Sequence, residues 1–118
     1  MKSNEYIKGT IKTIVLKLLS EKEKMYGYEI SQLVKELTAG QIELTYGALY
    51  PILYKLEKDG LLITNSEIVE GRVRKYYSLT QSGNETASKK VEELGKFVDL
   101  IKLILSPNPS TSFNPWPA

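Results

Sequence analysis

Two arginines separated by one residue are the feature of this sequence that most directly suggests chemistry. Arg72 and Arg74 are the only arginines in a chain that otherwise takes its positive charge from lysine. A guanidinium group presents a planar fork of donors that fits phosphate oxygens and guanine edges better than an ammonium group does. The pair therefore predicts contact with nucleic acid. The alternative is a solvated edge strand that its charge protects from aggregation.

Composition excludes most other chemistry. The 118 residues include no cysteine and no histidine, which removes disulfides, thiol nucleophiles, imidazole bases and the commonest zinc ligands. The carboxylates lie mostly beside lysines, and the sequence contains no glycine-rich phosphate loop. We therefore expect no catalytic residue, no metal, no cofactor and no enzyme. The net charge of +2 is small, so a nucleic-acid site depends on where the charge lies.

The length is that of one domain, and 42% hydrophobic with 25% charged residues is typical of a soluble globular protein. The longest apolar runs, 14–19 and 100–105, are short and each contains a lysine, so neither is expected to span a membrane. The start of the chain lacks the apolar core of a signal peptide. The cytoplasm is therefore the expected compartment.

Apolar residues at helical spacing predict three helices before the arginines, over residues 7–19, 26 or 27 to 37, and 46–58. Ser20 begins a sequence that resembles a capping box, although a loop is expected before the second helix. That helix is expected to bury Ile30, Leu33, Val34 and Leu37. Gly40 ends it, and an extended link over 41–44 follows. Thr45 is the predicted N-cap of the third helix, which Asp59 and Gly60 end.

The third helix has two different faces. Its core face is expected to carry Leu49, Ile52, Leu53 and Leu56. Its opposite face is expected to carry Gly47, Ala48, Pro51, Tyr54, Lys55 and Lys58. Pro51 lies past the first turn, where a proline usually costs a helix about 3 kcal/mol. The helix therefore either kinks at Pro51 or restarts there.

Strands are predicted over 61–66 and 72–79, with a turn near Glu70 and Gly71. Alternation along the second strand places Arg72, Arg74 and Tyr76 on one face. A last helix begins after Thr80 or Ser82. We expect a DNA-binding domain over 1–80, a dimerisation helix over 81–105 and a flexible proline-rich tail over 106–118, in which Trp116 could also plug a groove.

Three helices followed by a hairpin is the order of a winged helix-turn-helix, in which the third helix enters the major groove and the hairpin touches the flanking backbone. The expected fold is therefore mainly α with a small β-hairpin. Small residues would let the third helix approach base edges, and tyrosines would offer hydroxyls and rings to bases or phosphates. The residues expected at DNA are Tyr28, Thr45, Tyr46, Gly47, Ala48, Tyr50, Pro51, Tyr54, Lys55, Arg72, Arg74 and Lys75.

Three of the tyrosines have competing interpretations. Tyr46 falls nearer the core-facing side of the third helix, so its assignment to DNA rests mainly on its place in the first turn. Tyr50 could be partly buried against the second helix instead of facing DNA. Tyr26 is in register with Ile30 and Leu33, so core packing is expected for it. Tyr28 falls on the outer face of the same helix and is the better phosphate candidate.

The sequence closely resembles the PadR-like family of bacterial transcriptional regulators. The resemblance lies in four segments, 26–30, 47–51, 56–61 and 71–80, which read Tyr-Gly-Tyr-Glu-Ile, Gly-Ala-Leu-Tyr-Pro, Leu-Glu-Lys-Asp-Gly-Leu and Gly-Arg-Val-Arg-Lys-Tyr-Tyr-Ser-Leu-Thr. The four segments occur in this order and at these spacings, so the resemblance covers most of the chain. The resemblance implies that Pro51 lies inside the recognition helix, which favours the kink.

The resemblance also implies a homodimer, usually a repressor, in which the C-terminal helix of each subunit packs on its partner, often with the first helix. The last helix supports this, because its apolar positions follow a heptad rhythm that suits a partner helix. A twofold dimer would hold two recognition helices roughly 34 Å apart, so the operator should be an inverted repeat. The expected interface residues are Ile7, Ile11, Val91, Leu94, Gly95, Val98, Ile101 and Leu105.

In the subset of the family with one short C-terminal helix, planar small molecules bind at the dimer interface and relieve repression. This chain has room for one such helix and resembles that subset. Some members place an aromatic residue midway along the last helix, where this chain has Gly95, with Phe97 nearby. Gly95 could allow close helix packing or leave a void between subunits. Only the void would suit a small aromatic effector.

Two other functions fit the same residues. Winged helices also serve as protein-docking modules that never touch nucleic acid, and the fold alone does not separate the two. DNA binding through about six phosphates should weaken steeply with salt, whereas an apolar docking face should hardly respond. A ligand carrier with vestigial DNA binding would bind a small molecule without changing operator affinity.

Overall fold

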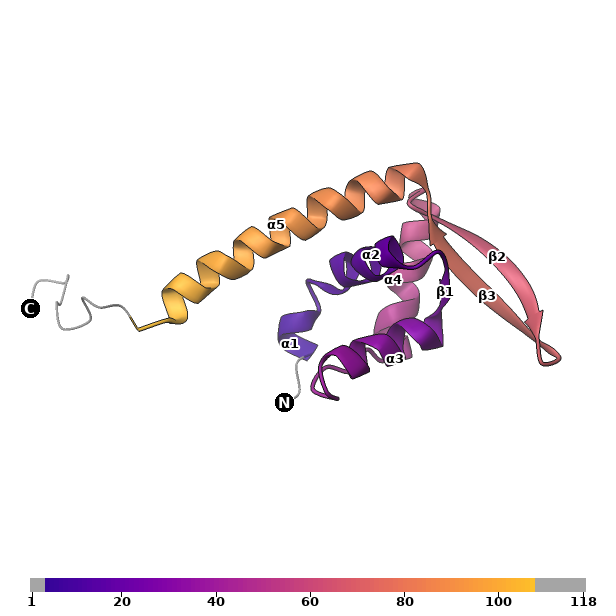
Figure 1. The fold of residues 1–118 in the computed structure, drawn as a ribbon, viewed down its shortest axis with the longest axis horizontal. Helices are drawn as coiled ribbons and strands as arrows, with labels where there is room; N and C mark the ends of the chain where they lie inside the picture. Colours follow the sequence, from indigo (N-terminus) through magenta and orange to yellow (C-terminus); the bar gives the residue numbers. More distant parts are fainter. Residues whose placement is uncertain (1–3, 108–118) are drawn as a thin grey trace, which may run out of the picture.

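The computed structural model describes residues 4–107, which form five helices and one three-stranded sheet (Figure 1). In chain order the elements are α1 (Asn4–Ile7), α2 (Ile11–Glu21), β1 (Met25–Tyr26), α3 (Gly27–Leu37), α4 (Tyr46–Lys58), β2 (Leu62–Val69), β3 (Arg72–Leu79) and α5 (Gln81–Leu105). None of these helices combines the length and the apolar character needed to cross a membrane. Trp116 and most of the predicted tail lie outside the described residues.

The helix predicted over 7–19 begins later, at Ile11, and a separate short helix, α1, ends at Ile7. Thr10 donates both its backbone N–H and its hydroxyl to the carbonyl of Ile7, each at 2.7 Å. This tight turn ends α1, and helical bonding resumes when Ile14 donates to the carbonyl of Thr10 at 2.9 Å. The capping box expected at Ser20 was also wrong. Ser20 lies inside α2 and donates its hydroxyl to the carbonyl of Lys17.

Helix α3 begins at Gly27 and ends at Leu37, as predicted. At its start the carboxylate of Glu29 accepts a hydrogen bond from the backbone N–H of Tyr26 at 3.1 Å. Ile30 and Val34 are buried and Leu33 is half-buried, but the prediction for Leu37 was wrong, because 68% of its surface is exposed. Leu37 is the last residue of α3 and lies beyond Val34, the last buried residue of the helix.

Helix α4 matches its predicted bounds. The hydroxyl of Thr45 accepts from the N–H of Ala48 at 3.2 Å and caps the first turn. Gly60 has a φ of 78°, and the next residue bonds back to the carbonyl of Leu56, which ends the helix. The helix runs unbroken through Pro51, so it does not restart there. On its core face Leu49, Leu53 and Leu56 are buried as expected and Ile52 is half-buried. Ala48 packs at the edge of the core, so its assignment to the opposite face was wrong.

The sheet has the order β1-β3-β2, and all its pairs are antiparallel. Strand β1 pairs Met25 with Tyr77, a strand too short for the sequence to indicate. Strand β2 runs three residues further than predicted, to Val69, and ends in a two-residue turn. Both turn residues have positive φ, 51° at Glu70 and 77° at Gly71, as a tight hairpin turn with the twist of its strands requires. We call the β2–β3 hairpin the wing.

Helix α5 begins at its N-cap Thr80, whose hydroxyl accepts from the N–H of Gly83. The alternative start after Ser82 was therefore wrong. The first half of α5 packs on α2, where Ala87 is buried and Val91 is half-buried. The second half continues past the helical body while the wing projects from the opposite end (Figure 1). The radius of gyration is 18.2 Å, against about 13 Å for a compact domain of this length.

Candidate nucleic-acid interface

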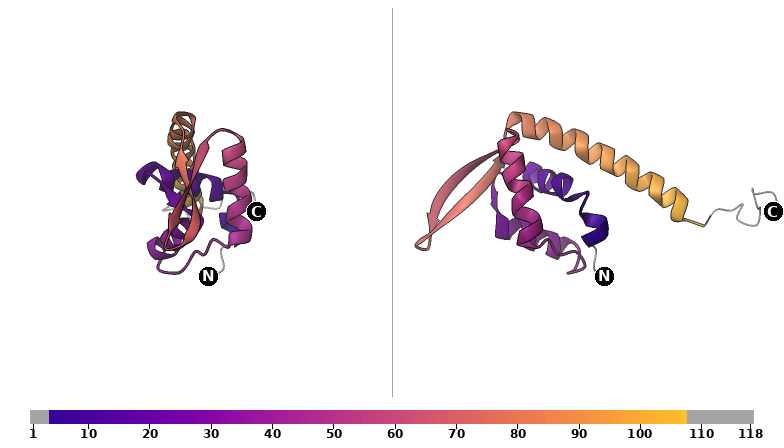
Figure 2. Two further views of the ribbon diagram at one scale, coloured as in Figure 1. Left: turned by 90° about the vertical axis from the view of Figure 1, so that its right-hand side faces the viewer. Right: turned by 180° about the vertical axis from the view of Figure 1, so that it is seen from behind.

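The outer face of α4 is an exposed row of tyrosines. Of the residues predicted at DNA, those exposed here are Thr45, Tyr46, Gly47, Tyr50, Pro51, Tyr54 and Lys55. Ala48 is half-buried and Thr45 already uses its hydroxyl as the helix cap. The rings of Tyr46 and Tyr50 meet edge to face, with centroids 5.7 Å apart. Figure 2 shows α4 along one side of the body, next to the wing.

Tyr50 joins α4 to the start of α3. A Cβ atom at Gly27 would lie 2.3 Å from the hydroxyl oxygen of Tyr50, so the glycine makes room for the ring. Tyr50 still has 44% of its surface exposed. It is therefore both packed against the second helix of the motif and accessible from outside.

Tyr26 is not a core residue, contrary to expectation. It is half-buried, and its ring stacks on Tyr28 with centroids 6.3 Å apart and meets Tyr76 edge to face at 5.4 Å. The guanidinium of Arg74 lies 4.6 Å from the centroid of the Tyr26 ring. We call these four residues the tyrosine–arginine cluster. Tyr28 is its exposed end, so the cluster joins the start of α3 to the wing.

Arg72 and Arg74 share a face of β3, as the alternation predicted. Arg72 is exposed and lies opposite Val69 across the wing, and Arg74 is half-buried and lies opposite Glu67. A hydrogen bond to Tyr76, the largest effect, raises the pKa of Arg74 above its already high ordinary value. Strand β1 pairs with β3 at Tyr76 and Tyr77, beyond the arginines. One side of β3 at the arginines therefore lies outside that pairing, as in an edge strand.

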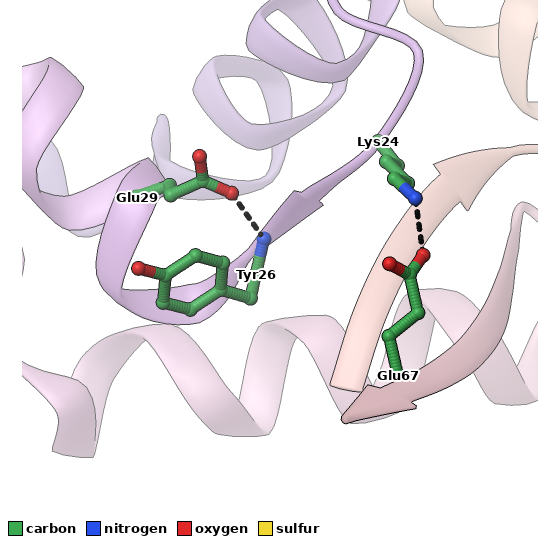
Figure 3. A network of polar contacts seen from close by, with 4 residues as sticks. All are labelled: Lys24, Tyr26, Glu29 and Glu67. Atoms are coloured by element: carbon green, nitrogen blue, oxygen red, sulfur yellow. Dashed lines mark hydrogen bonds and ion pairs between the residues drawn. The ribbon is translucent and has the colours of Figure 1, made fainter. Parts of the chain in front are cut away.

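A second cation ties the wing to the body. Lys24 forms an ion pair with Glu67 (Figure 3), and its ammonium nitrogen lies 4.8 Å from the centroid of the Tyr76 ring. The hydrogen bond to Glu67 raises the pKa of Lys24. No pattern in the sequence marks Lys24 and Glu67 as partners, because 43 positions separate them.

Lys75 and Lys55 are less available than predicted. The ammonium nitrogen of Lys75 lies 3.5 Å from the carboxylate of Glu57 on α4, and that carboxylate also accepts from the hydroxyl of Thr64 at 3.0 Å. Lys55 lies 3.7 Å from the carboxylate of Asp59. The two arginines therefore carry positive charge that these ion pairs do not neutralise. Within residues 4–107 no three acidic side chains gather closely enough to hold a metal ion.

The residues predicted at a dimer interface fall into two groups. Ile7 and Ile11 are 6% and 4% exposed, so the chain's own core covers them and they are not available to a partner as predicted. Val91, Leu94, Gly95 and Val98 line a groove against α2, a hollow of about 440 Å³ with Ile14 and Leu18 on its other wall. Ile101 is half-buried and Leu105 exposed. Four further apolar residues of α5 are exposed and were not among the predicted interface residues: Phe97, Leu100, Leu103 and Ile104.

Three helices with a helix-turn-helix formed by α3 and α4, followed by a wing, define a winged helix-turn-helix protein. This confirms the predicted fold class. The family model of the transcriptional regulator PadR-like family matches residues 15–89. The sequence is 31% identical over 106 residues to an uncharacterized protein of Lysinibacillus sphaericus, covering 89% of this chain and 96% of that protein.

Over 69 residues the chain is 36% identical to the transcriptional regulator Rv3488 of Mycobacterium tuberculosis, covering 56% of this chain and 64% of that one. Its fold is similar to that of a transcriptional regulator from Clostridium thermocellum, with a TM-score of 0.77 and 30% identity over 86% of this chain and 99% of the other. The chain belongs to the PadR-like family of transcriptional regulators. Regulators of this family bind DNA and are not enzymes.

Proposed function

We propose that this protein is a homodimeric repressor that binds an inverted-repeat operator, with α4 of each subunit in the major groove. The continuity of the exposed surface carries the proposal. Tyr50 packs against Gly27 at the start of α3, and Arg74 stacks on Tyr26 just before it. One surface therefore runs from the tyrosine row of α4, past Tyr28, to the wing. A bacterial protein that binds such an operator would work in the cytoplasm, where the DNA lies.

The residues divide into two roles on this surface. Gly47 adds no side chain at the front of α4, so the helix axis can approach base edges there, and Tyr46 and Tyr54 are exposed along it. Tyr28 and the two arginines lie to the side, where phosphates of the flanking backbone would pass. Arg74 is held by its ring contacts, so little rotamer freedom is lost when it meets a phosphate.

The C-terminal half of α5 supports the dimer. Leu103 and Ile104 are 74% and 76% exposed on a helix that has left the body of its own chain. Several exposed apolar side chains on one helix are typical of a surface that packs against another helix. We infer that this half of α5, with Val98 and Leu105, packs on a second copy.

The groove beside Gly95 supports an effector site. A Cβ atom at Gly95 would meet no other atom of its own chain within 4 Å, so open space borders the glycine on the side of the hollow. The hollow of about 440 Å³ lies within the range of small-molecule sites, about 300–1,000 Å³. We infer that a planar aromatic molecule binds there and relieves repression.

The operator and the dimer are tested together. Duplexes that the protein selects from random or genomic DNA should contain an inverted repeat, and log affinity should fall with log salt with a slope of about −5 for six phosphates. The variant Leu103→Asp with Ile104→Asp should sediment as a folded monomer, because both side chains are exposed in the single chain. Binding that ignores salt would favour a protein-docking module, and a folded variant that stays dimeric would exclude this interface.

The effector site is tested with the naphthalene dye ANS. Wild-type protein should enhance ANS fluorescence, and Gly95→Leu, which fills the hollow, should not. Operator DNA should weaken ANS binding by the same factor by which ANS weakens operator binding, because the coupling between two sites is reciprocal. Tight dye binding with no effect on the operator would indicate a ligand carrier instead.

A further inference from the structure

The end of α4 and the start of α5 are joined at Thr80. Its backbone N–H donates to the carbonyl of Leu61 at 3.1 Å, and its hydroxyl donates to the carbonyl of Gly60 at 2.8 Å. The same hydroxyl accepts from the N–H of Gly83 at 3.0 Å and thereby caps α5. One side chain therefore holds both the loop that ends the candidate recognition helix and the first turn of the long helix.

Gly83 brings the two backbones closer than another residue would allow. A Cβ atom at Gly83 would lie 2.0 Å from the carbonyl oxygen of Leu61 and 3.1 Å from a methyl carbon of Leu79. An ordinary carbon–oxygen contact is about 3.3–3.6 Å. The Leu61 oxygen belongs to the backbone and cannot rotate away as the end of a side chain could. Any larger residue must therefore displace α5 or the loop by more than about 1 Å.

A displacement at this joint is amplified along α5. The helix has 25 residues, which makes it about 37 Å long. A tilt of about 5° at its first turn would move its last turn by about 3 Å, close to the base-pair step of about 3.4 Å. The last turns carry the exposed apolar side chains of the proposed dimer contact. The angle at the joint would therefore set how far apart the two copies of α4 lie.

We propose that Thr80 and Gly83 are positioning residues that set the half-site spacing this regulator accepts. The proposal rests on the proposed dimeric operator binding. Gly83 is buried and Thr80 is half-buried, and both act through Leu61 and Gly60. Their effect is on the separation of the two reading helices and not on the contacts of either helix with its half-site.

The test uses duplexes that carry two selected half-sites, with the spacer between them changed one base pair at a time. Wild-type protein should show one preferred spacer. Gly83→Ala should bind that duplex about tenfold more weakly and should prefer another spacer or several equally. Its affinity for a duplex with a single half-site should stay within about twofold of wild type. Ser82→Ala, an exposed neighbour in the same turn, should keep the wild-type profile.

A milder pair of variants covers the case in which Gly83→Ala fails to fold. Thr80→Val removes the hydroxyl that links Gly60 to Gly83, and Thr80→Ser keeps it. The valine variant should flatten the spacer profile and the serine variant should not. If Gly83→Ala or Thr80→Val protein is folded and keeps the wild-type spacer preference, the proposed role of Thr80 and Gly83 in setting the spacing is wrong. Wild-type protein that binds one half-site as tightly as two would overturn the proposed dimeric operator instead.

Discussion

The hydroxyl of Tyr50 lies directly over Gly27, where a Cβ atom would come within 2.3 Å of its oxygen and 2.7 Å of the adjoining ring carbon. The two residues belong to different helices of the helix-turn-helix, so their contact sets where the ring of Tyr50 points. The flexible end of a side chain can move away from an added methyl group, whereas a backbone atom cannot. Substitution at Gly27 should therefore act mainly on the position of Tyr50.

We expect Gly27→Ala to weaken operator binding about tenfold and to lower the free energy of unfolding by only about 1 kcal/mol. Tyr50→Ala should weaken binding by a similar factor. The double variant should lose no more than either single one, because both changes remove the same ring from the DNA surface. Titration of labelled operator with all four proteins checks this. Losses that add in the double variant would show that Gly27 acts independently of Tyr50.

Gly47→Ala should stabilise the fold and weaken DNA binding. A methyl group at Gly47 meets no atom within 4 Å of its Cβ, and alanine is favoured over glycine inside a helix by about 1 kcal/mol. Urea unfolding should therefore show a gain of about 0.5–1 kcal/mol. Operator affinity should fall, because the methyl group holds the helix away from base edges. Unchanged affinity would mean that the front of α4 does not approach the bases.

Arg74→Ala should weaken binding to operator and to random duplex by the same factor, because a phosphate contact carries no sequence information. The salt slope should decrease in magnitude by about 1. Arg72→Ala provides the matched comparison two residues away on the same face. If Arg74→Ala instead relaxed the preference at one base pair, the guanidinium would be reading a base edge.

Tyr77→Phe should make stability less sensitive to alkaline pH. Burial, the largest effect, raises the pKa of Tyr77 above its ordinary value of 10.0. The unfolded chain therefore loses this proton at lower pH than the folded protein does. The stabilisation is fully present below about pH 10 and is lost as the pH rises above it. Urea midpoints across this range should fall more steeply for wild type than for Tyr77→Phe.

Local signals predicted the helix-turn-helix, the hairpin turn and the bounds of β3 correctly, whereas β2 extends three residues beyond its predicted end. The bounds of α3 and α4 follow from a cap at Thr45, a glycine stop at Gly60 and apolar residues at helical spacing. The hairpin turn at Glu70 and Gly71 was likewise marked by residue type. The arginine pair could be recognised for the same reason. Each of these signals depends on residues only a few positions apart in the sequence. Helical spacing placed only Tyr54 of the three α4 tyrosines on the outer face, and the structure shows that Tyr46 and Tyr50 are exposed as well.

The tertiary structure decided what depends on distant residues meeting. The two-residue strand β1 and the ring contact of Tyr26 with Tyr76 have no local signal, because partners far along the chain stabilise them. The close approach of Gly83 to Leu61 likewise joins residues that are far apart in the sequence. Residue type and periodicity determined which segments are helical and where charge lies. Only the packed chain decided which side chains stay exposed, because burial is a property of neighbours in space.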